Sequence, residues 1–161
     1  MRPDLELAYG EHRKQIFNYF RRCGLRGDEA EDLTQSVFAT VLATLGRYEP
    51  SRGSLGGYIY GVARNHRRSF WKSMRRRTGR TEDAPRAARS ADADTVAIVK
   101  EAVGALPDDQ REALLLREFH GLSYDEIALV QGVPIGTVRS RISRAREALR
   151  ESLHAPGERQ P

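Results

Sequence analysis

The sequence predicts an all-α protein in which two small helical domains are joined by a flexible linker. Apolar residues recur at helical spacing through most of the 161 residues, and strand-like alternation is hard to find. The segment 76–94, RRTGRTEDAPRAARSADAD, lacks a periodic apolar pattern and consists of small, polar and charged residues. Because this composition is typical of linkers, we place the two domains at residues 1–75 and 95–155.

The first two helices are expected over residues 4–23 and 28–46. In the second, Asp28 and Glu31 have the spacing of a capping box, and Gly46 is placed to end the helix. The residues expected to face inward from the first helix are Leu7, Ile16, Phe17 and Phe20. The apolar stripe of the second consists of Leu33, Val37, Val41 and Leu45, widened by Phe38 and Leu42.

A third helix is expected to begin at Ser54, and its second half is strongly basic. Between residues 64 and 80 there are eight basic residues and no acidic one, interleaved with His66, Phe70 and Trp71. Such a pattern suits single-stranded nucleic acid, because cations follow the phosphates and rings stack on unpaired bases. The segment is also compatible with a solvated basic face above a core of Tyr58, Ile59, Val62 and Phe70.

The second domain opens with Val96, Val99 and Val103 on one helical face, and a further helix is expected within residues 106–121. Pro107 suits a first helical turn, and Asp108 and Asp109 would lie near the positive end of the helix dipole. The residues expected to be buried on this helix are Leu114, Leu115 and Phe119.

A helix-turn-helix is expected next. Ser123 and Glu126 form a capping box for a short helix spanning about 124–130. Gly132 can adopt the left-handed backbone conformation that the turn requires, and the second helix begins near Pro134 or Ile135. The inward residues are Ile127, Ala128 and Val130 on the short helix, and Val138, Ile142, Ala145 and Leu149 on the long one.

The long helix carries five arginines and one glutamate between residues 136 and 150. In a helix-turn-helix the second helix enters the major groove by its N-terminal part. The residues that could then reach base edges or phosphates are Thr137, Arg139, Ser140 and Arg144, whereas Arg150 would contact the DNA backbone or solvent.

The composition favours a nucleic-acid partner. The net charge is +5, and 24 of the 27 lysines and arginines are arginine, whose planar guanidinium matches phosphates and guanine edges. A genome rich in arginine codons would produce the same bias. Cys23 and four scattered histidines share no ligand spacing, so we expect no metal and no cofactor. With neither a signal peptide nor an apolar run of about 20 residues, the sequence indicates a cytosolic protein without membrane insertion.

Three stretches resemble, in order, segments of bacterial RNA polymerase sigma factors of the extracytoplasmic-function (ECF) type, within the sigma-70 family. DEAEDLTQSVF resembles the helix that binds core polymerase. YEPSRGSLGGYIYGVARNHRR is similar to the segment that opens and reads the promoter −10 element, and ALPDDQREALLLREFHGLSYDEIALVQGVPIGTVRSRISRAREAL to the domain that reads the −35 element. The resemblance covers about residues 4–153.

The resemblance implies a factor without catalytic chemistry that binds core RNA polymerase and directs promoter-specific transcription initiation in the bacterial cytoplasm. Residues 1–75 would be sigma region 2 and residues 95–155 sigma region 4. The implied partners are the clamp helices of the largest polymerase subunit, the flap, promoter DNA and an anti-sigma factor. The residues implied in polymerase binding are Asp32, Leu33, Gln35, Ser36 and Phe38, of which Leu33 and Phe38 could equally be core residues.

The resemblance also implies two sets of DNA contacts. The −10 set is Tyr58, Arg64, Asn65 and Arg68, and the −35 set is Thr137, Arg139, Ser140, Arg141 and Arg144. The chain departs from many relatives at Leu55 and Tyr58, where they have phenylalanine and tryptophan, and at the flexible pair Gly56-Gly57. Ser143 replaces a larger apolar residue of some relatives. The −10 loop and the −35 preference are therefore expected to differ.

Two other classes of function fit the sequence less well. A stand-alone helix-turn-helix repressor or activator has no reason to carry DEAEDLTQSVF together with the basic aromatic segment. An enzyme such as a nuclease would need grouped carboxylates, a nucleophile with its base, or a phosphate-binding loop, and the sequence offers none of these. The sequence therefore favours the initiation factor.

Overall fold

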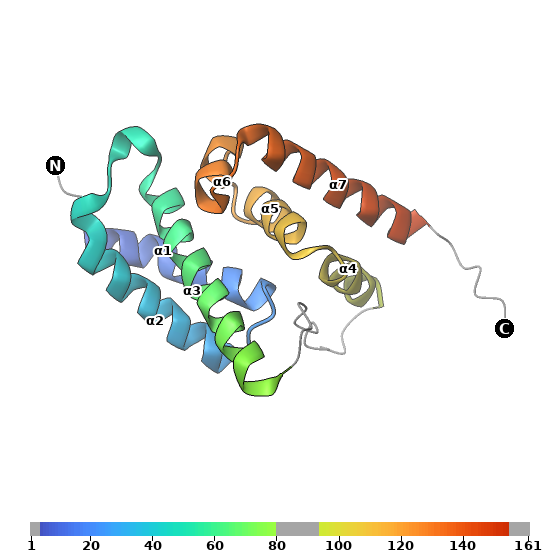
Figure 1. Ribbon diagram of the computed structural model, residues 1–161, viewed down its shortest axis with the longest axis horizontal. Coiled ribbons are helices and arrows are strands. Elements are labelled where there is room, and N and C mark those ends of the chain that lie inside the picture. The colour runs from blue at the N-terminus through green and yellow to red at the C-terminus, as the bar shows by residue number, and fades with distance from the viewer. Residues whose placement is uncertain (1–3, 80–93, 155–161) are drawn as a thin grey trace.

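The computed structural model describes residues 4–79 and 94–154, and within those ranges the chain is helical without a strand. Figure 1 shows α1, α2 and α3 on one side of the molecule and α4 to α7 on the other. We call these two groups the N-terminal half and the C-terminal half. The all-α prediction is confirmed.

The N-terminal half consists of α1 (Leu5–Arg22), α2 (Gly27–Thr44) and α3 (Leu55–Thr78), with one-turn 3-10 helices at Leu45–Arg47 and Pro50–Arg52. Asp4 caps α1 by accepting hydrogen bonds from the backbone N–H groups of its first turn. The inward prediction is confirmed for Ile16 and Phe20 but wrong for Leu7, which is 61% exposed. The buried stripe begins instead at Ala8, which lies about 100° around the helix from Leu7.

The start of α2 differs from the prediction. Glu29, not Glu31, reaches back to accept from the backbone N–H of Arg26 at 2.8 Å, so the capping carboxylate lies two residues earlier than expected. Glu31 pairs with Arg13 of α1 instead. The helix ends at Thr44, and Gly46 lies within the 3-10 turn rather than stopping the helix. Leu42, expected in the stripe, is 63% exposed.

Helix α3 is the longest described helix. The helix was predicted to begin at Ser54; it begins at Leu55, and Ser54 caps it, with its Oγ accepting from the N–H of Gly57 at 3.0 Å. The helix ends at Thr78, where Gly79 adopts a φ of +64° that favours glycine. Ile59, Tyr60 and Ala63 are buried on its inner face.

The C-terminal half consists of α4 (Asp94–Gly104), α5 (Asp108–Glu118), α6 (Tyr124–Gln131) and α7 (Ile135–His154). Val96 and Val99 are 49% and 39% exposed, so the first part of the predicted valine stripe lies at the surface. Leu114 and Leu115 are buried as predicted, whereas Phe119 is 59% exposed. Phe119 follows the last residue of α5, and its ring lies under the guanidinium of Arg22 at 4.6 Å.

The helix-turn-helix is confirmed. Ser123 and Glu126 form the predicted capping box at the start of α6. Gly132 ends that helix with a φ of +65°, and α7 begins at Ile135 as expected. Val138, Ile142 and Ala145 are buried, so the apolar row of α7 packs inward while its arginines lie around the remaining surface.

The two halves share a single hydrophobic core. The buried cluster runs from Ile16, Phe20 and Ile59 in the N-terminal half to Leu116 and Ile127 in the C-terminal half. Helix α3 packs directly against α6, and Figure 1 shows both α5 and α6 facing it. The predicted linker therefore joins two halves that contact each other, although most of that segment lies outside the described residues.

Candidate nucleic-acid interface

Polar side chains from α3 meet polar side chains from α5 where the two halves touch. We call this group the interdomain charge cluster and define it as Arg64 and Arg67 of α3 with Asp108, Asp109 and Glu112 of α5. Both arginines and Glu112 are buried, with residue exposures of 8%, 2% and 1%. Buried charges are tolerated only when they are paired and hydrogen-bonded. The three buried charged side chains all have ion-pair partners, although Nη2 of Arg67 has no hydrogen-bond partner among the described residues.

Glu112 lies at the centre of the cluster. Its Oε2 accepts from Nε of Arg64 at 3.0 Å and lies 3.2 Å from Nη2 of Arg67. Its Oε1 accepts from the hydroxyl of Tyr19 at 2.8 Å. The amide Nε2 of Gln131 also donates to Oε2 at 3.1 Å. One carboxylate from α5 thus holds residues of α1, α3 and α6.

Tyr19 completes the cluster from the N-terminal half. Its hydroxyl accepts from Nε of Arg67 at 3.1 Å while it donates to Glu112. Burial, together with the negative charge of Glu112, raises the pKa of Tyr19 well above its ordinary value. The phenol therefore stays protonated and remains a donor at neutral pH.

Asp108 occupies the first position of α5, where the partial positive charge of the helix end favours a carboxylate. Its Oδ1 accepts from Nη1 of Arg67 at 2.9 Å and from Nη2 of Arg111 at 3.1 Å. Burial alone would raise the pKa of Asp108, but the charge of Arg67 and the hydrogen bonds from both arginines outweigh burial and lower it. Asp108 is therefore ionised at neutral pH.

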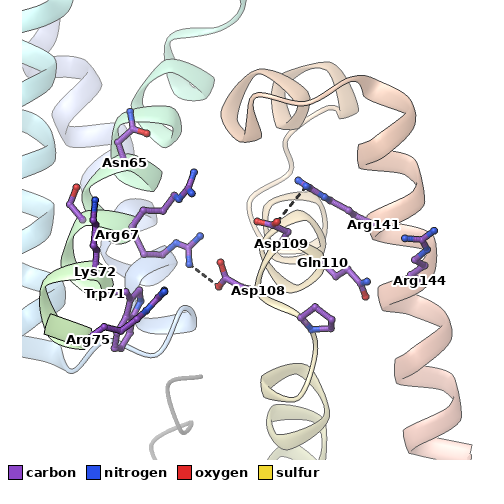
Figure 2. Close-up of a pocket in the computed structure, with 13 residues that line it drawn as sticks. Asn65, Arg67, Trp71, Lys72, Arg75, Asp108, Asp109, Gln110, Arg141 and Arg144 are labelled. Atoms are coloured by element: carbon purple, nitrogen blue, oxygen red, sulfur yellow. Dashed lines mark hydrogen bonds and ion pairs between the residues drawn. The ribbon is translucent and has the colours of Figure 1, made fainter. Parts of the chain in front are cut away.

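Asp109 joins the two helices that carry the predicted DNA contacts. Its Oδ1 lies 3.5 Å from Nη2 of Arg64 on α3, and its Oδ2 lies 3.4 Å from Nη2 of Arg141 on α7. Arg141 also donates to Oε1 of Gln131 at 2.9 Å. Figure 2 shows Asp109 between the two helices, with the dashed line marking its ion pair to Arg141.

The predicted −10 residues divide into an exposed pair and an engaged pair. Asn65 and Arg68 are exposed on α3, one turn apart. Arg64 belongs to the interdomain charge cluster. Tyr58 is half-buried. Its hydroxyl donates to the backbone oxygen of Thr44 and lies 2.7 Å from the Oγ1 of the same residue. Tyr58 therefore ties α3 to the end of α2 in this arrangement.

The predicted −35 residues lie on the first three turns of α7. Arg139, Ser140 and Arg144 are exposed, whereas Thr137 is half-buried. Arg141 is also half-buried because Asp109 and Gln131 hold it. The three exposed side chains are those that a DNA duplex could reach without rearrangement of the C-terminal half.

A basic cleft opens between the two halves beside the charge cluster (Figure 2). Its volume is about 1020 Å³. Arginine and lysine side chains line both walls, with acidic groups between them at the start of α5. The lining residues include Asn65, Arg68, Trp71 and Lys72 on the α3 wall and Arg141 and Arg144 on the α7 wall. Two residues of each predicted DNA-contacting set therefore line a common space, Asn65 and Arg68 from α3 and Arg141 and Arg144 from α7.

The predicted polymerase-binding residues lie along α2. Asp32, Gln35 and Ser36 are exposed on the side away from the core. Leu33 is half-buried and packs against the hydrophobic cluster. Phe38 is only 7% exposed, and its ring meets that of Tyr9 edge-on at 4.8 Å. The structure thus places Phe38 in the core and leaves the three polar residues accessible.

Sequence reasoning missed four residues that the structure makes central: Tyr19, Arg67, Glu112 and Gln131. A signal was present for Glu112, because it lies three and four residues before Leu115 and Leu116 and therefore on their buried face. The pattern gave no sign of its partners, which come from other helices.

Two features were not found among the described residues. No group of three or more histidine, cysteine, aspartate or glutamate side chains in residues 4–79 and 94–154 is placed to hold a metal ion. In the same ranges no helix is both long and apolar enough to cross a membrane.

Comparison with known proteins places both halves among transcription proteins. The model of sigma-70 region 2 matches residues 8–80, and the model of sigma-70 region 4 matches residues 97–149. The ECF RNA polymerase sigma factor SigE of Mycolicibacterium smegmatis is 32% identical over 94% of this chain and 62% of its own length. The ECF factor EcfG of Rhodopseudomonas palustris is 33% identical over 81% of this chain and 74% of its own length.

A solved structure has the same fold. The sigma factor RpoE of Bartonella quintana, in complex with the anti-sigma factor NepR, superposes with a TM-score of 0.77 at 25% identity. The alignment covers 94% of this chain and 98% of that chain. The chain spans 62% of the length of the M. smegmatis relative, so that protein has residues with no counterpart here.

Proposed function

This chain belongs to the extracytoplasmic-function family of RNA polymerase sigma factors, and we propose on that basis that it binds core RNA polymerase and directs promoter-specific transcription initiation. The observation that carries the proposal is the occurrence of regions 2 and 4 in order on one chain, with the helix-turn-helix in the second. A stand-alone repressor would need only the latter. The proposed place of action is the bacterial cytoplasm, and the proposed role involves no catalysis by the chain itself.

The outer face of α2 is the proposed polymerase contact. Asp32, Gln35 and Ser36 are exposed there, and their side chains can form hydrogen bonds to a partner helix without disturbing the core. The burial of Phe38 gives it a role in holding α2 against α1. Leu33, half-buried at the edge, would supply apolar contact.

Helix α3 is the proposed reader of the −10 element. Asn65 and Arg68 are exposed on one face, where an amide can pair with a base edge and a guanidinium can follow the phosphates. Arg64 and Tyr58 would join them once their present partners are exchanged. Helix α7 is the proposed reader of the −35 duplex through Arg139, Ser140 and Arg144, with Thr137 and Arg141 beside them.

An anti-sigma factor is a proposed regulator. The B. quintana neighbour was solved with such a partner, and the fold is shared over nearly all of both chains. The basic cleft between the halves, with its mixed charge, is where a partner chain could contact both halves at once.

Run-off transcription with purified core polymerase and a promoter library tests the proposal. The expected result is a stable complex with core polymerase at micromolar concentration or below and transcripts that start from a subset of promoters. A chain that binds duplex DNA specifically but fails to bind core polymerase would instead be a stand-alone regulator, and the proposal would be wrong.

A further inference from the structure

We infer that the basic cleft between the two halves is a binding site for a nucleoside polyphosphate. Its phosphates would lie among Arg68, Lys72 and Arg144. Its base would stack on the indole ring of Trp71. The site follows from the lining of the cleft alone. Its consequence for DNA rests on the proposed function, because Asn65 and Arg68 in the same lining are also proposed DNA contacts.

The cleft has the size of a small-molecule site. Its volume of about 1020 Å³ is close to the upper end of the range of about 300–1,000 Å³ that ligand pockets occupy. Most such pockets are lined mainly by apolar side chains. This one is lined by six basic and two acidic side chains, together with the polar side chains of Asn65, Ser69 and Gln110. The lining therefore suits a compact and highly charged ligand.

The two acidic side chains of the lining already have cationic partners within the protein. Asp108 accepts from Nη1 of Arg67 at 2.9 Å. Asp109 lies 3.4 Å from Nη2 of Arg141. Because each carboxylate is paired with a guanidinium of the same lining, neither one neutralises the remaining cations of the cleft.

Three cations of the lining have no such partner. Arg68 and Lys72 are exposed one turn apart on α3, and Arg144 is exposed on α7. None of the three forms an ion pair or a side-chain hydrogen bond with another residue in 4–79 or 94–154. Positive charges that line a cleft with low-dielectric walls focus the field and attract anions. Since these charges are divided between two walls of a large cleft, a chain of phosphates matches them better than a single phosphate.

Trp71 supplies a flat apolar surface in the same cleft (Figure 2). Its indole is half-buried and meets the ring of Phe70 edge-on, with a centroid distance of 5.1 Å, so the two rings brace each other on α3. Any nucleobase can stack on an aromatic side chain. The amides of Asn65 and Gln110 can also pair with a base edge. A ring and two amides beside the cations favour a nucleotide over an inorganic polyphosphate.

The bounded volume of the cleft favours a single nucleotide over a nucleic-acid strand. Sites for a single strand are grooves that follow its backbone over about four or more nucleotides. The cleft instead has the volume of one small ligand. A strand can still reach Asn65 and Arg68, which are exposed on α3. A nucleotide in the cleft and a strand along α3 would therefore compete for the same two side chains.

Titration of the full-length chain with ATP, GTP, inorganic tripolyphosphate and guanosine tests the site, followed by calorimetry and by fluorescence. Trp71 is the only tryptophan of the chain, so its emission reports directly on the cleft. A nucleoside triphosphate should bind with a dissociation constant below about 1 mM and quench Trp71 in a saturable way. Tripolyphosphate should bind more weakly, and guanosine should not bind measurably. If neither triphosphate saturates the emission change, the inference is overturned.

Variants of the cleft separate the role of the phosphates from that of the base. Lys72→Gln and Arg144→Gln should each weaken the binding of the nucleotide and of tripolyphosphate about tenfold, because each removes a charged partner of the phosphates. Trp71→Leu should weaken the nucleotide about tenfold and leave tripolyphosphate nearly unchanged, because only the nucleotide has a base that stacks. Calorimetry measures all three variants, and circular dichroism checks that their helical content is unchanged. If Trp71→Leu binds the nucleotide as the wild type does, the ligand is not a nucleoside polyphosphate.

The matched control is Lys14→Gln. It removes an exposed lysine from α1, outside the cleft, and so changes the net charge by the same amount as Lys72→Gln. The control should bind the nucleotide with the affinity of the wild type. Equal weakening by Lys14→Gln and Lys72→Gln would mean that the nucleotide is attracted by net charge alone, and the cleft would then not be a site.

Competition with a single-stranded oligothymidine probe tests the consequence for DNA. At ten times its dissociation constant, the nucleotide should weaken binding of the probe about elevenfold, since Asn65 and Arg68 would serve both ligands. Sodium chloride at the same ionic strength is the control, because salt alone weakens DNA binding. Equal weakening by nucleotide and salt would contradict the competition. None of these measurements contains core polymerase, so failure of the nucleotide site is distinguishable from failure of the proposed function in run-off transcription.

Discussion

Nε of Arg64 on α3 donates to Oε2 of Glu112 on α5 at 3.0 Å, and the two side chains are 9% and 1% exposed. This pair links residues 48 positions apart across the contact between the halves. Each residue depends on the other, because a buried charge that loses its partner retains the cost of desolvation without the compensating attraction.

A double-mutant cycle should reveal this dependence. Glu112→Ala and Arg64→Ala should each lower the free energy of unfolding of the full chain by about 3 kcal/mol, since each removes the nearest partner of a buried charge. The double variant should be less destabilised than the sum of the two, with a coupling energy of about 1–3 kcal/mol. Urea denaturation followed by circular dichroism measures all four proteins. Strict additivity would show that the two side chains act independently.

The contact between the halves should also depend on pH through His120. This residue of the C-terminal half lies against Tyr19 and Tyr60 of the N-terminal half, with its Nδ1 2.7 Å from the Tyr60 hydroxyl. Its Nε2 is buried and has no hydrogen-bond partner among the described residues. Burial, followed by the positive charge of Arg22, lowers the pKa of His120 from 6.5 to about 4. The neutral ring is therefore the form that fits.

The lowered pKa of His120 makes the folded chain less stable as the pH falls. The stabilisation from neutral His120 is fully present above pH 6.5, and it is lost as the pH falls from 6.5 through about 4, because the unfolded or separated chain then binds the extra proton. At about 1.4 kcal/mol for each pH unit, the loss reaches at most about 3 kcal/mol. Urea denaturation at a series of pH values between 7 and 4 measures it.

His120→Phe is the control for this dependence. It keeps a ring between the two tyrosines but cannot bind a proton, so the slope of stability against pH should become much shallower. A residual slope of the same sign is expected from His66, whose pKa burial also lowers. Asp108 contributes separately at more acidic pH, since its lowered pKa means that its stabilisation is lost only as the pH falls below about 3.8. An unchanged slope in His120→Phe would contradict the assignment.

Local features of the fold could be predicted from the sequence because neighbouring residues determine them. The Ser123–Glu126 capping box, the left-handed Gly132 and the buried row from Val138 to Ala145 all depend on spacings of four residues or fewer. A prediction was wrong where two nearby residues could make the same capping contact. Glu29 and Glu31 both lie near the start of α2, and the structure uses Glu29 because the helix begins earlier.

Exposed apolar residues could not be identified from periodicity alone. Leu7 and Leu42 lie beside the buried stripes of α1 and α2. The hydrophobic pattern of one helix does not show how much of its surface the neighbouring helix covers. The exposed pair of Asn65 and Arg68 was predicted as part of the candidate site. The burial of Arg64 was not, because its partners belong to the other half and their approach depends on tertiary packing over 45 and 48 residues.

Binding of core polymerase should depend on the polar face of α2. Asp32→Ala combined with Gln35→Ala should weaken binding about tenfold or more, since both side chains are exposed and their loss leaves partner groups unpaired. The matched control is Glu11→Ala, which removes an exposed charge from α1 in the same half. Fluorescence anisotropy with labelled protein and core polymerase measures both. Equal affinities for the double variant and the control would remove these residues from the interface.

Recognition of the −35 duplex should depend on Arg144. The side chain is exposed on α7, three turns from its start, and if it makes a bidentate contact to a guanine, Arg144→Ala should cost about 1–3 kcal/mol on the preferred sequence. Arg150→Ala, farther along the same helix and also exposed, is the control and should cost less on that sequence. Titration of each variant against the preferred duplex and a scrambled one separates the two kinds of contact. If Arg144 contacts a base, Arg144→Ala should weaken binding to the preferred duplex alone. Equal weakening on both duplexes would make Arg144 a phosphate contact, and the affinity of the variant would then also depend less on salt.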